Sequence, residues 1–392
     1  MVRFGDAISA DSHVTEPEAA YATIHPAYAD RAPRPVDAPG QGAAMVVDPG
    51  GPGERVVPFG RMAMAGRTHI PKPEGWGWDE LHPGGFDPLA RLDEMRRDGC
   101  AAEVLYPSVG MVLCNHPDRA YQRACFEAYN RWLAEWCATD PERLVGIGQT
   151  AAREPDEAIA DLEAIVALGL RGVMLPGFPA VHDWHHPQWD PFWDAVADLG
   201  LPASFHILTS GEGTRWRGPG MNGFLGVIHS NQDLLGALVF GGVFARHPDL
   251  RVVCVEADAG WVPHFGFRMD SLYERHRHWV GRSDPTLASR DPGAVHADLP
   301  RAPSTYLFEQ VYLTFQDDEI ALRSIDLMNR DRLLWANDHP HSDATWPNSE
   351  QVRRRFAALV DDTTLTKVLR DNCAALYGID VTDAPRRALD PS

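Results

Sequence analysis

Short apolar segments alternate with helical segments along most of this chain of 392 residues. Segments such as residues 118–138 and 156–168 carry apolar side chains at helical spacing, and apolar stretches with strand-like composition lie between them. Counting the stretch that ends near Asp11, we expect eight strands. Apolar strands that alternate with helices predict a parallel sheet covered on both faces, and eight such units form a (β/α)8 barrel. The sequence therefore predicts an α/β fold of the TIM-barrel class.

The expected elements follow one another in a regular order. The strands are expected at residues 4–11, 102–107, 144–150, 171–177, 202–207, 250–257, 310–315 and 332–338, and the helices at 89–99, 118–138, 156–168, 191–199, 226–246, 262–277 and 319–328. An open doubly wound sheet is the alternative fold. It would place a glycine-rich phosphate-binding turn after the first strand, but residues 9–17 contain no glycine.

Two segments rich in proline and glycine interrupt this alternation. One covers about residues 18–88 after the first strand, and the other covers about residues 283–304 before the seventh strand. Neither has the apolar periodicity of a second core, so we interpret them as inserts over the barrel mouth. Residues 1–392 are accordingly expected to form a single domain.

The overall charge limits the partners that this chain can bind. The sequence contains 36 Lys and Arg against 55 Asp and Glu, a formal net charge of −19, which disfavours nucleic acid and anionic membranes. It contains no apolar run long enough to span a bilayer and no signal peptide, so a cytoplasmic location is expected. The six cysteines form no C-x-x-C pair and are expected to be reduced.

The predicted strand ends carry residues that bind metal ions. In a (β/α)8 barrel, side chains at the carboxyl ends of the strands converge on one face, where catalysis takes place. These ends carry Asp11, His13, His206, Glu256 and Asp338. Alternate residues of an extended strand point the same way, so Asp11 and His13 can reach one ion. We therefore predict a metal site at the barrel mouth.

These residues lie in motifs that resemble a known family. The segments DSHVTEP from Asp11, VEADAGWVPHFGFRMD from Val255 and NDHPHSDATWPNS from Asn337 are similar to the amidohydrolase-related, metal-dependent TIM-barrel family, which includes hydrolases and non-oxidative decarboxylases. The resemblance implies that Asp11, His13, His206 and Asp338 bind metal. Its decarboxylases carry a histidine followed by glycines after strand six. Here Glu256 takes that place, which weakens a decarboxylase assignment.

Further candidate ligands lie close to the strand ends. Glu16 follows His13 by three residues, His229 begins the helix after strand five, and His339 and His341 follow Asp338. Glu16 could instead cap a helix, and His229 could face solvent. Asp338 is the candidate general acid or base, and His341 is a candidate catalytic residue or a hydrogen-bond partner of a metal ligand.

The number of these candidate ligands is larger than the three or four protein ligands that one zinc ion takes. Carboxylates and imidazoles in this number suit two iron ions that activate dioxygen. The motifs are also most similar to the non-heme di-iron monooxygenase branch of the family, of the platensimycin and platencin diterpenoid hydroxylase type. That similarity implies hydroxylation of a bulky apolar substrate, of the coenzyme A-linked diterpenoid kind, with O2.

The inserts supply candidate substrate contacts. They are rich in Trp, Phe, Met and Gly, which suits an apolar lid. Arg215 and Arg217 could bind the phosphates of a coenzyme A thioester, and Trp261 is a further substrate-binding candidate. The Trp-rich segment 131–136 could form a homodimer contact.

Two other functions remain open. On the same scaffold, a single zinc or manganese ion could serve a hydrolase acting on an ester, amide or thioester, or a non-oxidative decarboxylase. A barrel that only binds a ligand at its mouth is the third possibility, and it predicts no tightly held metal.

Overall fold

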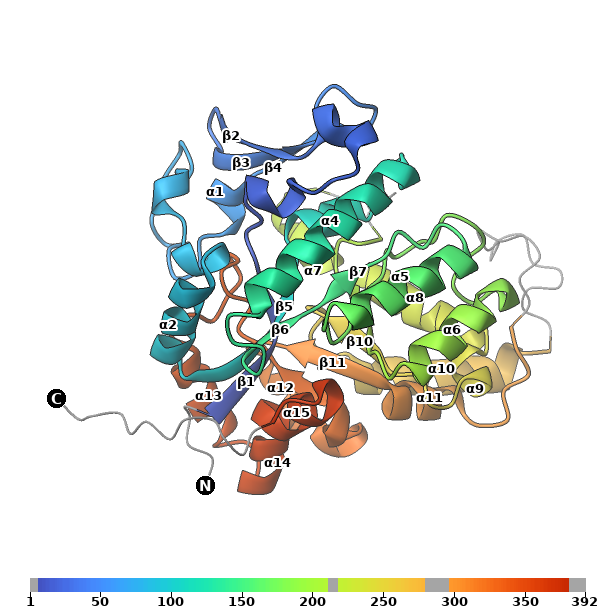
Figure 1. Ribbon diagram of the computed structural model, residues 1–392. Coiled ribbons are helices and arrows are strands. Elements are labelled where there is room, and N and C mark those ends of the chain that lie inside the picture. The colour runs from blue at the N-terminus through green and yellow to red at the C-terminus, as the bar shows by residue number, and fades with distance from the viewer. Residues whose placement is uncertain (1–5, 211–217, 279–295, 381–392) are drawn as a thin grey trace.

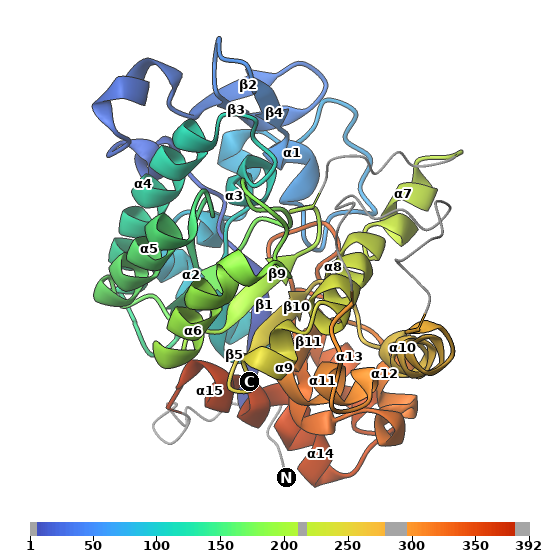
Figure 2. The ribbon, with the colours of Figure 1, turned by 90° about the vertical axis from the view of Figure 1, so that its right-hand side faces the viewer.

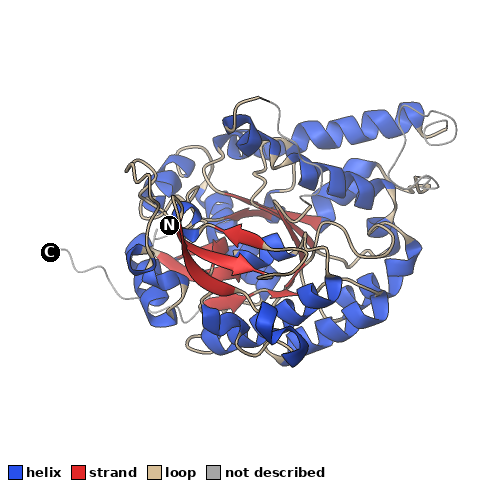
Figure 3. Cartoon of the chain, turned by 90° about the horizontal axis from the view of Figure 1, so that it is seen from above, coloured by secondary structure: helices blue, strands red, loops and turns tan. Residues whose placement is uncertain are grey.

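The computed structural model describes residues 6–210, 218–278 and 296–380, and parallel strands surrounded by helices form its centre (Figures 1 and 3). The strands of this ring are β1 (Ala7–His13), β5 (Cys100–Tyr106), β6 (Leu144–Gly146), β7 (Gly148–Gln149), β8 (Val173–Met174), β9 (Ala203–His206), β10 (Val252–Val255), β11 (Val311–Phe315) and β12 (Leu333–Trp335). Only Ile147 separates β6 from β7, so these two segments occupy one position of the barrel. The predicted TIM-barrel fold is confirmed.

The helices pack around the outside of the strand ring (Figure 3). The longer ones are α2 (Pro88–Asp98), α4 (Arg119–Cys137), α5 (Pro155–Ala167), α6 (Asp190–Asp198), α8 (His229–Phe240), α10 (Val262–His276), α11 (Pro303–Gln310) and α13 (Ser349–Phe356). Local sequence sets their ends. The Asp87 side chain accepts the backbone N–H of Leu89 at 2.9 Å to begin α2, and Gly99 ends it with a φ of 73°.

Two predicted helices are shorter than expected. The predicted helix 226–246 is divided, because α7 (Met221–Gly226) ends before α8 begins and Gly242, with a φ of 76°, separates α8 from α9 (Val243–Arg246). The predicted helix 319–328 is α12 (Glu319–Arg323) followed by a 3-10 turn at Ile325–Leu327. A further 3-10 turn, Arg330–Arg332, leads into β12. The chain then closes with α14 (Asp362–Thr366), a π-helix at Lys367–Asp371 and α15 (Asn372–Tyr377).

The first insert contains a small sheet that the sequence reading missed. Strands β2 (Arg34–Ala38), β3 (Gly42–Val47) and β4 (Arg55–Val57) pair antiparallel and are followed by α1 (Phe59–Met62). This sheet lies at the opposite end of the molecule from α13 to α15 (Figures 1 and 2). Its buried side chains, such as Met45 and Val47, belong to the same core as the barrel. The 3-10 turns of the insert are Glu18–Tyr21, Pro26–Arg31, Trp78–Glu80 and Pro83–Gly85.

Side chains and loop amides close the barrel between its first and last strands. The Asp338 N–H donates to the Asp11 carbonyl at 3.0 Å. Arg91, which is completely buried, donates to the carbonyls of His13 and His339 at 2.9 Å each. Its Nε donates to Glu103 at 2.5 Å, so the buried charge has a partner. The C-terminal ends of β1 and β12 are therefore held together directly beneath the predicted site.

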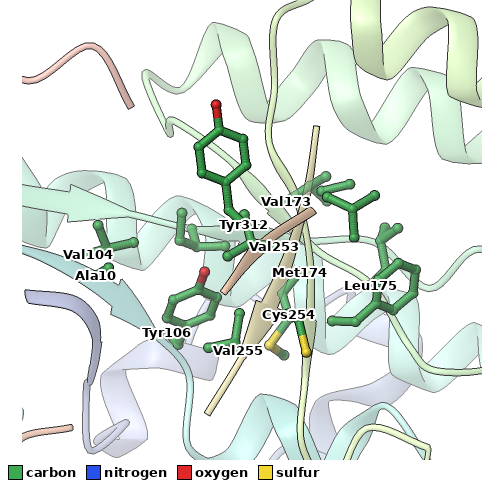
Figure 4. Close-up of a cluster of buried hydrophobic side chains, with 14 of the residues drawn as sticks. Ala10, Val104, Tyr106, Val173, Met174, Leu175, Val253, Cys254, Val255 and Tyr312 are labelled. Atoms are coloured by element: carbon green, nitrogen blue, oxygen red, sulfur yellow. The ribbon is translucent and has the colours of Figure 1, made fainter. Parts of the chain in front are cut away.

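Buried side chains from several strands form the core (Figure 4). Val104, Met174 and Val253 come from β5, β8 and β10, so residues remote in sequence pack together. All six cysteines are buried and free of disulfide bonds, as expected. In the parts of the chain that the structure describes, no helix combines the length and apolar character needed to cross a bilayer.

Candidate metal centre

Four predicted ligands meet at the C-terminal ends of three strands. Asp11 and His13 end β1, His206 ends β9, and Glu256 follows β10. The first three side chains are fully buried, and Glu256 is 13% exposed. Asp11 Oδ1 lies 3.4 Å from His13 Nε2 and 3.6 Å from His206 Nε2. One ligand atom from each of the four residues lies within 4.8 Å of the others.

Asp338 and His341 complete the cluster from the loop after β12. Asp338 Oδ1 lies 3.4 Å from His13 Nε2 and 3.2 Å from His341 Nδ1. The rings of His13 and His341 are stacked, with their centroids 3.8 Å apart. His13, Glu256, Asp338 and His341 therefore form a second group of ligand atoms that overlaps the first.

The hydrogen bonds of two imidazoles determine which nitrogen faces the pocket. His13 Nδ1 lies 3.1 Å from the Pro107 carbonyl, and His206 Nδ1 lies 3.0 Å from the Ile207 carbonyl. A carbonyl only accepts, so in the neutral form each Nδ1 carries the proton and each Nε2 presents a lone pair. The two Nε2 atoms are 3.1 Å apart. Facing lone pairs repel, and a cation bound to both of them removes that repulsion.

Two buried carboxylates point to the same conclusion. Among the residues that the structure describes, none forms a hydrogen bond with either oxygen of Asp11 or of Asp338. Burial, followed by the charge of Asp11, raises the pKa of Asp338 well above its usual range. Burial also opposes ionisation of Asp11, but His13 and His206 hold its pKa below the usual range. Unpaired buried carboxylates are costly, so this donor set fits a divalent metal ion such as manganese, iron or zinc.

A serine that the sequence reading did not select orients His341. Ser108 Oγ donates to the Val14 carbonyl at 2.7 Å and lies 2.9 Å from His341 Nε2. Because the serine proton is already donated, His341 Nε2–H donates to Ser108 and Nδ1 turns toward Asp338. Burial lowers the pKa of His341 to about 3, which keeps the ring neutral. Ser108 follows β5 closely, so a survey of every strand end could have found it.

The structure does not bring Glu16 to the cluster. Its carboxylate accepts the backbone N–H groups of Ser108, Val109 and Gly110 at 2.9–3.2 Å, at the start of α3 (Val109–Leu113). Burial raises the pKa of Glu16 to about 7, although these hydrogen bonds lower it. The expectation that Glu16 binds metal thus gains no support, whereas the alternative of a helix cap describes its contacts.

The other described candidates belong to neither ligand group. His339 Nε2 lies 2.8 Å from Glu94, outside both ligand groups. His229 is the first residue of α8 and belongs to neither group. Trp261 donates to the Ala257 carbonyl at 2.7 Å and thereby holds the loop after β10. Arg215 and Arg217, and most of the insert expected at 283–304, lie outside the described residues.

Two residues of the cluster have strained backbones. Glu256 and Asp338 have φ values of 57° and 55°, a region that residues other than glycine rarely adopt. Such conformations persist where the surrounding structure holds them, and they concentrate at functional sites. Glu256 N–H donates to Thr314 Oγ1 at 2.8 Å, which helps to hold this turn.

A cavity of about 480 Å³ adjoins the cluster. Glu256 is the member of the cluster that lines it, and Gln316 lines it as well. The remaining walls are Asp258, Phe315, Asp317, Asp343, Ala344, Thr345, Asn348, Gln351, Val352 and Arg355. Burial, followed by the charge of Asp318, raises the pKa of Asp258 to about 6. A polar, acidic chamber therefore leads to the candidate metal centre.

Comparison with known proteins identifies the family. The family model described as amidohydrolase matches residues 65–379. The chain belongs to the amidohydrolase family. A γ-resorcylate decarboxylase from Rhodococcus jostii is 26% identical to this amidohydrolase-family chain over 341 residues, covering 78% of it and 92% of the relative.

Solved structures agree with the barrel fold. The crystal structure of an amidohydrolase from Mycobacterium avium subsp. paratuberculosis superposes with a TM-score of 0.72 at 18% identity, covering 95% of this chain and 99% of that one. A dihydroxybenzoic acid decarboxylase from Polaromonas, solved with bound manganese and the inhibitor 2-nitroresorcinol, gives a TM-score of 0.63 at 16% identity and covers 97% and 99%.

These relatives correct the function expected from sequence. The prediction of a di-iron monooxygenase that hydroxylates a coenzyme A-linked substrate with O2 is wrong, because the relatives are decarboxylases. The expected pair of iron ions gains no support either, whereas a neighbouring structure holds manganese. The number of candidate ligands exceeded the needs of one ion and therefore suggested two. Glu16 and His339, however, form hydrogen bonds outside the cluster. The membership of a metal-dependent barrel family was predicted correctly.

Proposed function

We propose that this chain is a metal-dependent, non-oxidative decarboxylase of an aromatic carboxylic acid. The observation that carries the proposal is the pair of inward Nε2 lone pairs, 3.1 Å apart, beside unpartnered buried carboxylates. A chain with this donor set that shares 26% identity with a γ-resorcylate decarboxylase is suited to the same type of reaction. We assign one manganese ion as the metal, by analogy with the manganese in the Polaromonas decarboxylase.

The residues of the cluster divide into two roles. Asp11, His13, His206 and Asp338 would hold the ion, because their donor atoms are buried and converge. The ion would supply positive charge that anchors the substrate carboxylate and an adjacent hydroxyl group. Glu256 lines the cavity, so its carboxyl can reach a ring placed there.

The reaction needs one proton for each carbon dioxide released. The bond between the ring and the carboxyl carbon breaks, and a new C–H bond forms at the same ring carbon. We assign delivery of that proton to Glu256 Oε2, which lies 3.3 Å from His206 Nε2 at the inner end of the cavity. Glutamate would thus perform proton transfer where the decarboxylases that this sequence resembles use histidine.

The test combines metal analysis with an assay performed without oxygen. Protein loaded with Mn²⁺ is incubated under argon with a panel of mono- and dihydroxybenzoic acids, and carbon dioxide release is measured. We expect oxygen-independent release from at least one acid and about one manganese per chain. A requirement for O2, or release of an alcohol or amine from esters and amides without any decarboxylation, would overturn the proposal.

A substitution of Glu256 tests its role in proton delivery. We expect Glu256→Gln to lower kcat at least about 100-fold, because general acid catalysis contributes on that order. The manganese content should stay unchanged, since the four assigned ligands remain. Glu135→Gln, which removes the same group from an exposed position on α4, is the matched control and should keep full activity. Equal activity of Glu256→Gln and the unmodified protein would refute the role.

A further inference from the structure

The cavity beside the metal centre has the size of a small-molecule binding site. Its volume of about 480 Å³ lies within the usual range for ligand pockets. Glu256 forms its inner wall, next to the assigned metal ligand His206. A substrate whose carboxylate is anchored at the metal would therefore extend its remote end into this cavity.

The walls of the cavity carry an excess of negative charge. Asp258, Asp317 and Asp343 contribute carboxylates, and Arg355 is the single basic residue among the described residues that line it. Arg355 already pairs with Asp317 through Nη2 and approaches Glu319 at 3.5 Å through Nε. The charge of Arg355 is thus matched by these carboxylates, and Asp258 and Asp343 face the cavity without a basic neighbour among its walls.

The arrangement of these carboxylates does not suit a second metal ion. Within the ranges that the structure describes, clusters of potential metal-binding atoms occur only at the metal centre, and none includes Asp258, Asp317 or Asp343. Carboxylates spread around a chamber instead suit a ligand that brings its own hydrogen-bond donors, because ionised carboxylates only accept. The neighbouring side chains of Gln316, Thr345 and Asn348 are polar as well.

We propose that the substrate carries an ammonium group on the side of the ring remote from the reacting carboxylate, and that Asp258 and Asp343 bind this group. The inference rests on the proposed function, which places the reacting carboxylate at the metal. It replaces the bulky apolar substrate expected from sequence with an aromatic acid that bears an aminoalkyl group. The same walls disfavour a second carboxylate or a phosphate at this end of the substrate.

Three matched probes test this preference on the manganese-loaded full chain. They are 2-hydroxybenzoates that bear a methyl, an aminomethyl or a carboxymethyl group opposite the carboxylate, and titration calorimetry gives their dissociation constants. We expect the aminomethyl probe to bind about ten-fold more tightly than the methyl probe, and the carboxymethyl probe to bind more weakly than both. The difference should shrink at high salt because the mouth is open to solvent.

Single substitutions connect the preference to its residues. Asp258→Asn and Asp343→Asn should each reduce the aminomethyl preference several-fold and leave the affinity for the methyl probe unchanged. Asparagine has nearly the size and shape of aspartate, so the variants can fold, and circular dichroism checks that they do. Asp198→Asn removes the same charge from the exposed last residue of α6, away from the cavity walls, and should keep the full preference.

The outcomes separate the two proposals. Equal affinity for the aminomethyl and methyl probes, or no binding of the aminomethyl probe, overturns the inference. If some hydroxybenzoic acids lose carbon dioxide while no probe preference exists, the proposed function stands and the inference fails. If the aminomethyl preference depends on Asp258 and Asp343 but no acid is decarboxylated, the cavity selects as inferred and the proposed reaction is wrong.

Discussion

At the level of single residues, the metal centre depends on which nitrogen of each histidine carries the proton. Backbone carbonyls bind Nδ1 of His13 and His206, so Nε2 is free for a cation in both. His341 has the opposite arrangement, because Ser108 binds its Nε2 and leaves Nδ1 toward Asp338. Partners of this kind fix ring orientation as well as protonation, and their loss usually weakens metal binding.

The serine can be tested directly. Ser108→Ala removes the acceptor for His341 Nε2–H, so the ring can rotate and present its proton to Asp338. We expect the affinity for Mn²⁺ to fall about ten-fold, as measured by electron paramagnetic resonance of free Mn²⁺. Ser108→Thr keeps the hydroxyl and should restore the affinity. Unchanged affinity in the alanine variant would show that the contact does not orient the ring.

The residues that were predicted correctly to meet share one property. Asp11, His13 and His206 lie at strand ends, and barrel geometry alone brings such positions together. Glu16 and His339 lie in loops, where side-chain direction depends on contacts made far along the chain. Glu16 turns to the amides of α3, and His339 turns to Glu94. Residue types and spacing do not contain that information.

At the level of elements, one buried arginine connects the two strands whose ends bear Asp11, His13 and Asp338. Arg91 on α2 binds the carbonyls of His13 and His339, and its charge is matched by Glu103. It therefore holds the β1 and β12 ends of the barrel at a fixed separation. Removing one partner of a buried pair leaves an uncompensated charge, which is strongly destabilising.

We expect Arg91→Leu to lower the free energy of unfolding by about 3 to 5 kcal/mol, because Glu103 and two backbone carbonyls lose their donor. Urea denaturation of the metal-free protein measures this change. Arg96→Leu on the same helix is the control. Arg96 is exposed and pairs with the exposed Asp93 three residues earlier, so its loss should cost less than about 1 kcal/mol. Similar losses for both variants would contradict the proposed role of Arg91.

Glu16 connects the segment after β1 to α3 and gives a test by pH. Burial raises its pKa from 4.5 to about 7, so the folded state binds the proton more tightly than the unfolded chain. The resulting stability is fully present below pH 4.5 and is lost as the pH rises through about 7. The shift corresponds to a loss of up to about 3 kcal/mol between these limits.

The glutamine side chain of Glu16→Gln does not titrate, so the stability of this variant should not decline in this way as the pH rises. Its free energy of unfolding relative to the unmodified protein should therefore increase from pH 5 to pH 8. Glu18→Gln, at an exposed position in the next turn, should follow the unmodified protein at every pH. A parallel pH dependence of Glu16→Gln and the unmodified protein would mean that Glu16 is ionised throughout.

Local sequence explains which elements were predicted well. Helix α2 has an aspartate cap, a first-turn proline and a terminal glycine, and its observed bounds match the expectation closely. The division at Gly242 was missed, because the apolar periodicity continues through residues 226–246. The helical backbone conformation is interrupted at Gly242 all the same. The sheet β2–β3–β4 was missed for another reason. Its strands are short and separated by proline and glycine, so alternation is too brief to recognise.

At the level of the whole molecule, fold and reaction differ in how far the sequence determines them. The strand and helix order and the ligand motifs led to the correct barrel family. The reaction was predicted wrongly, because the number of ligand residues in the sequence was taken as the number in the pocket. The reaction depends on the few side chains that lie together in the pocket. The three-dimensional structure determines which of the candidate residues these are.

Metal binding should make the stability of the whole chain depend on manganese. The centre concentrates Asp11, Asp338 and facing imidazoles in a buried space, and an ion that binds only the folded state stabilises it by mass action. At 100 times the dissociation constant the gain is about 2.7 kcal/mol, which corresponds to a rise of about 3 °C in Tm for a chain of this length. Scanning calorimetry of protein treated with chelator and then reloaded with Mn²⁺ measures it. Asp338→Asn should lose this rise while still folding, because it removes one of two carboxylates that repel each other in the metal-free protein. An equal rise in Asp338→Asn would place the stabilising ion at another site.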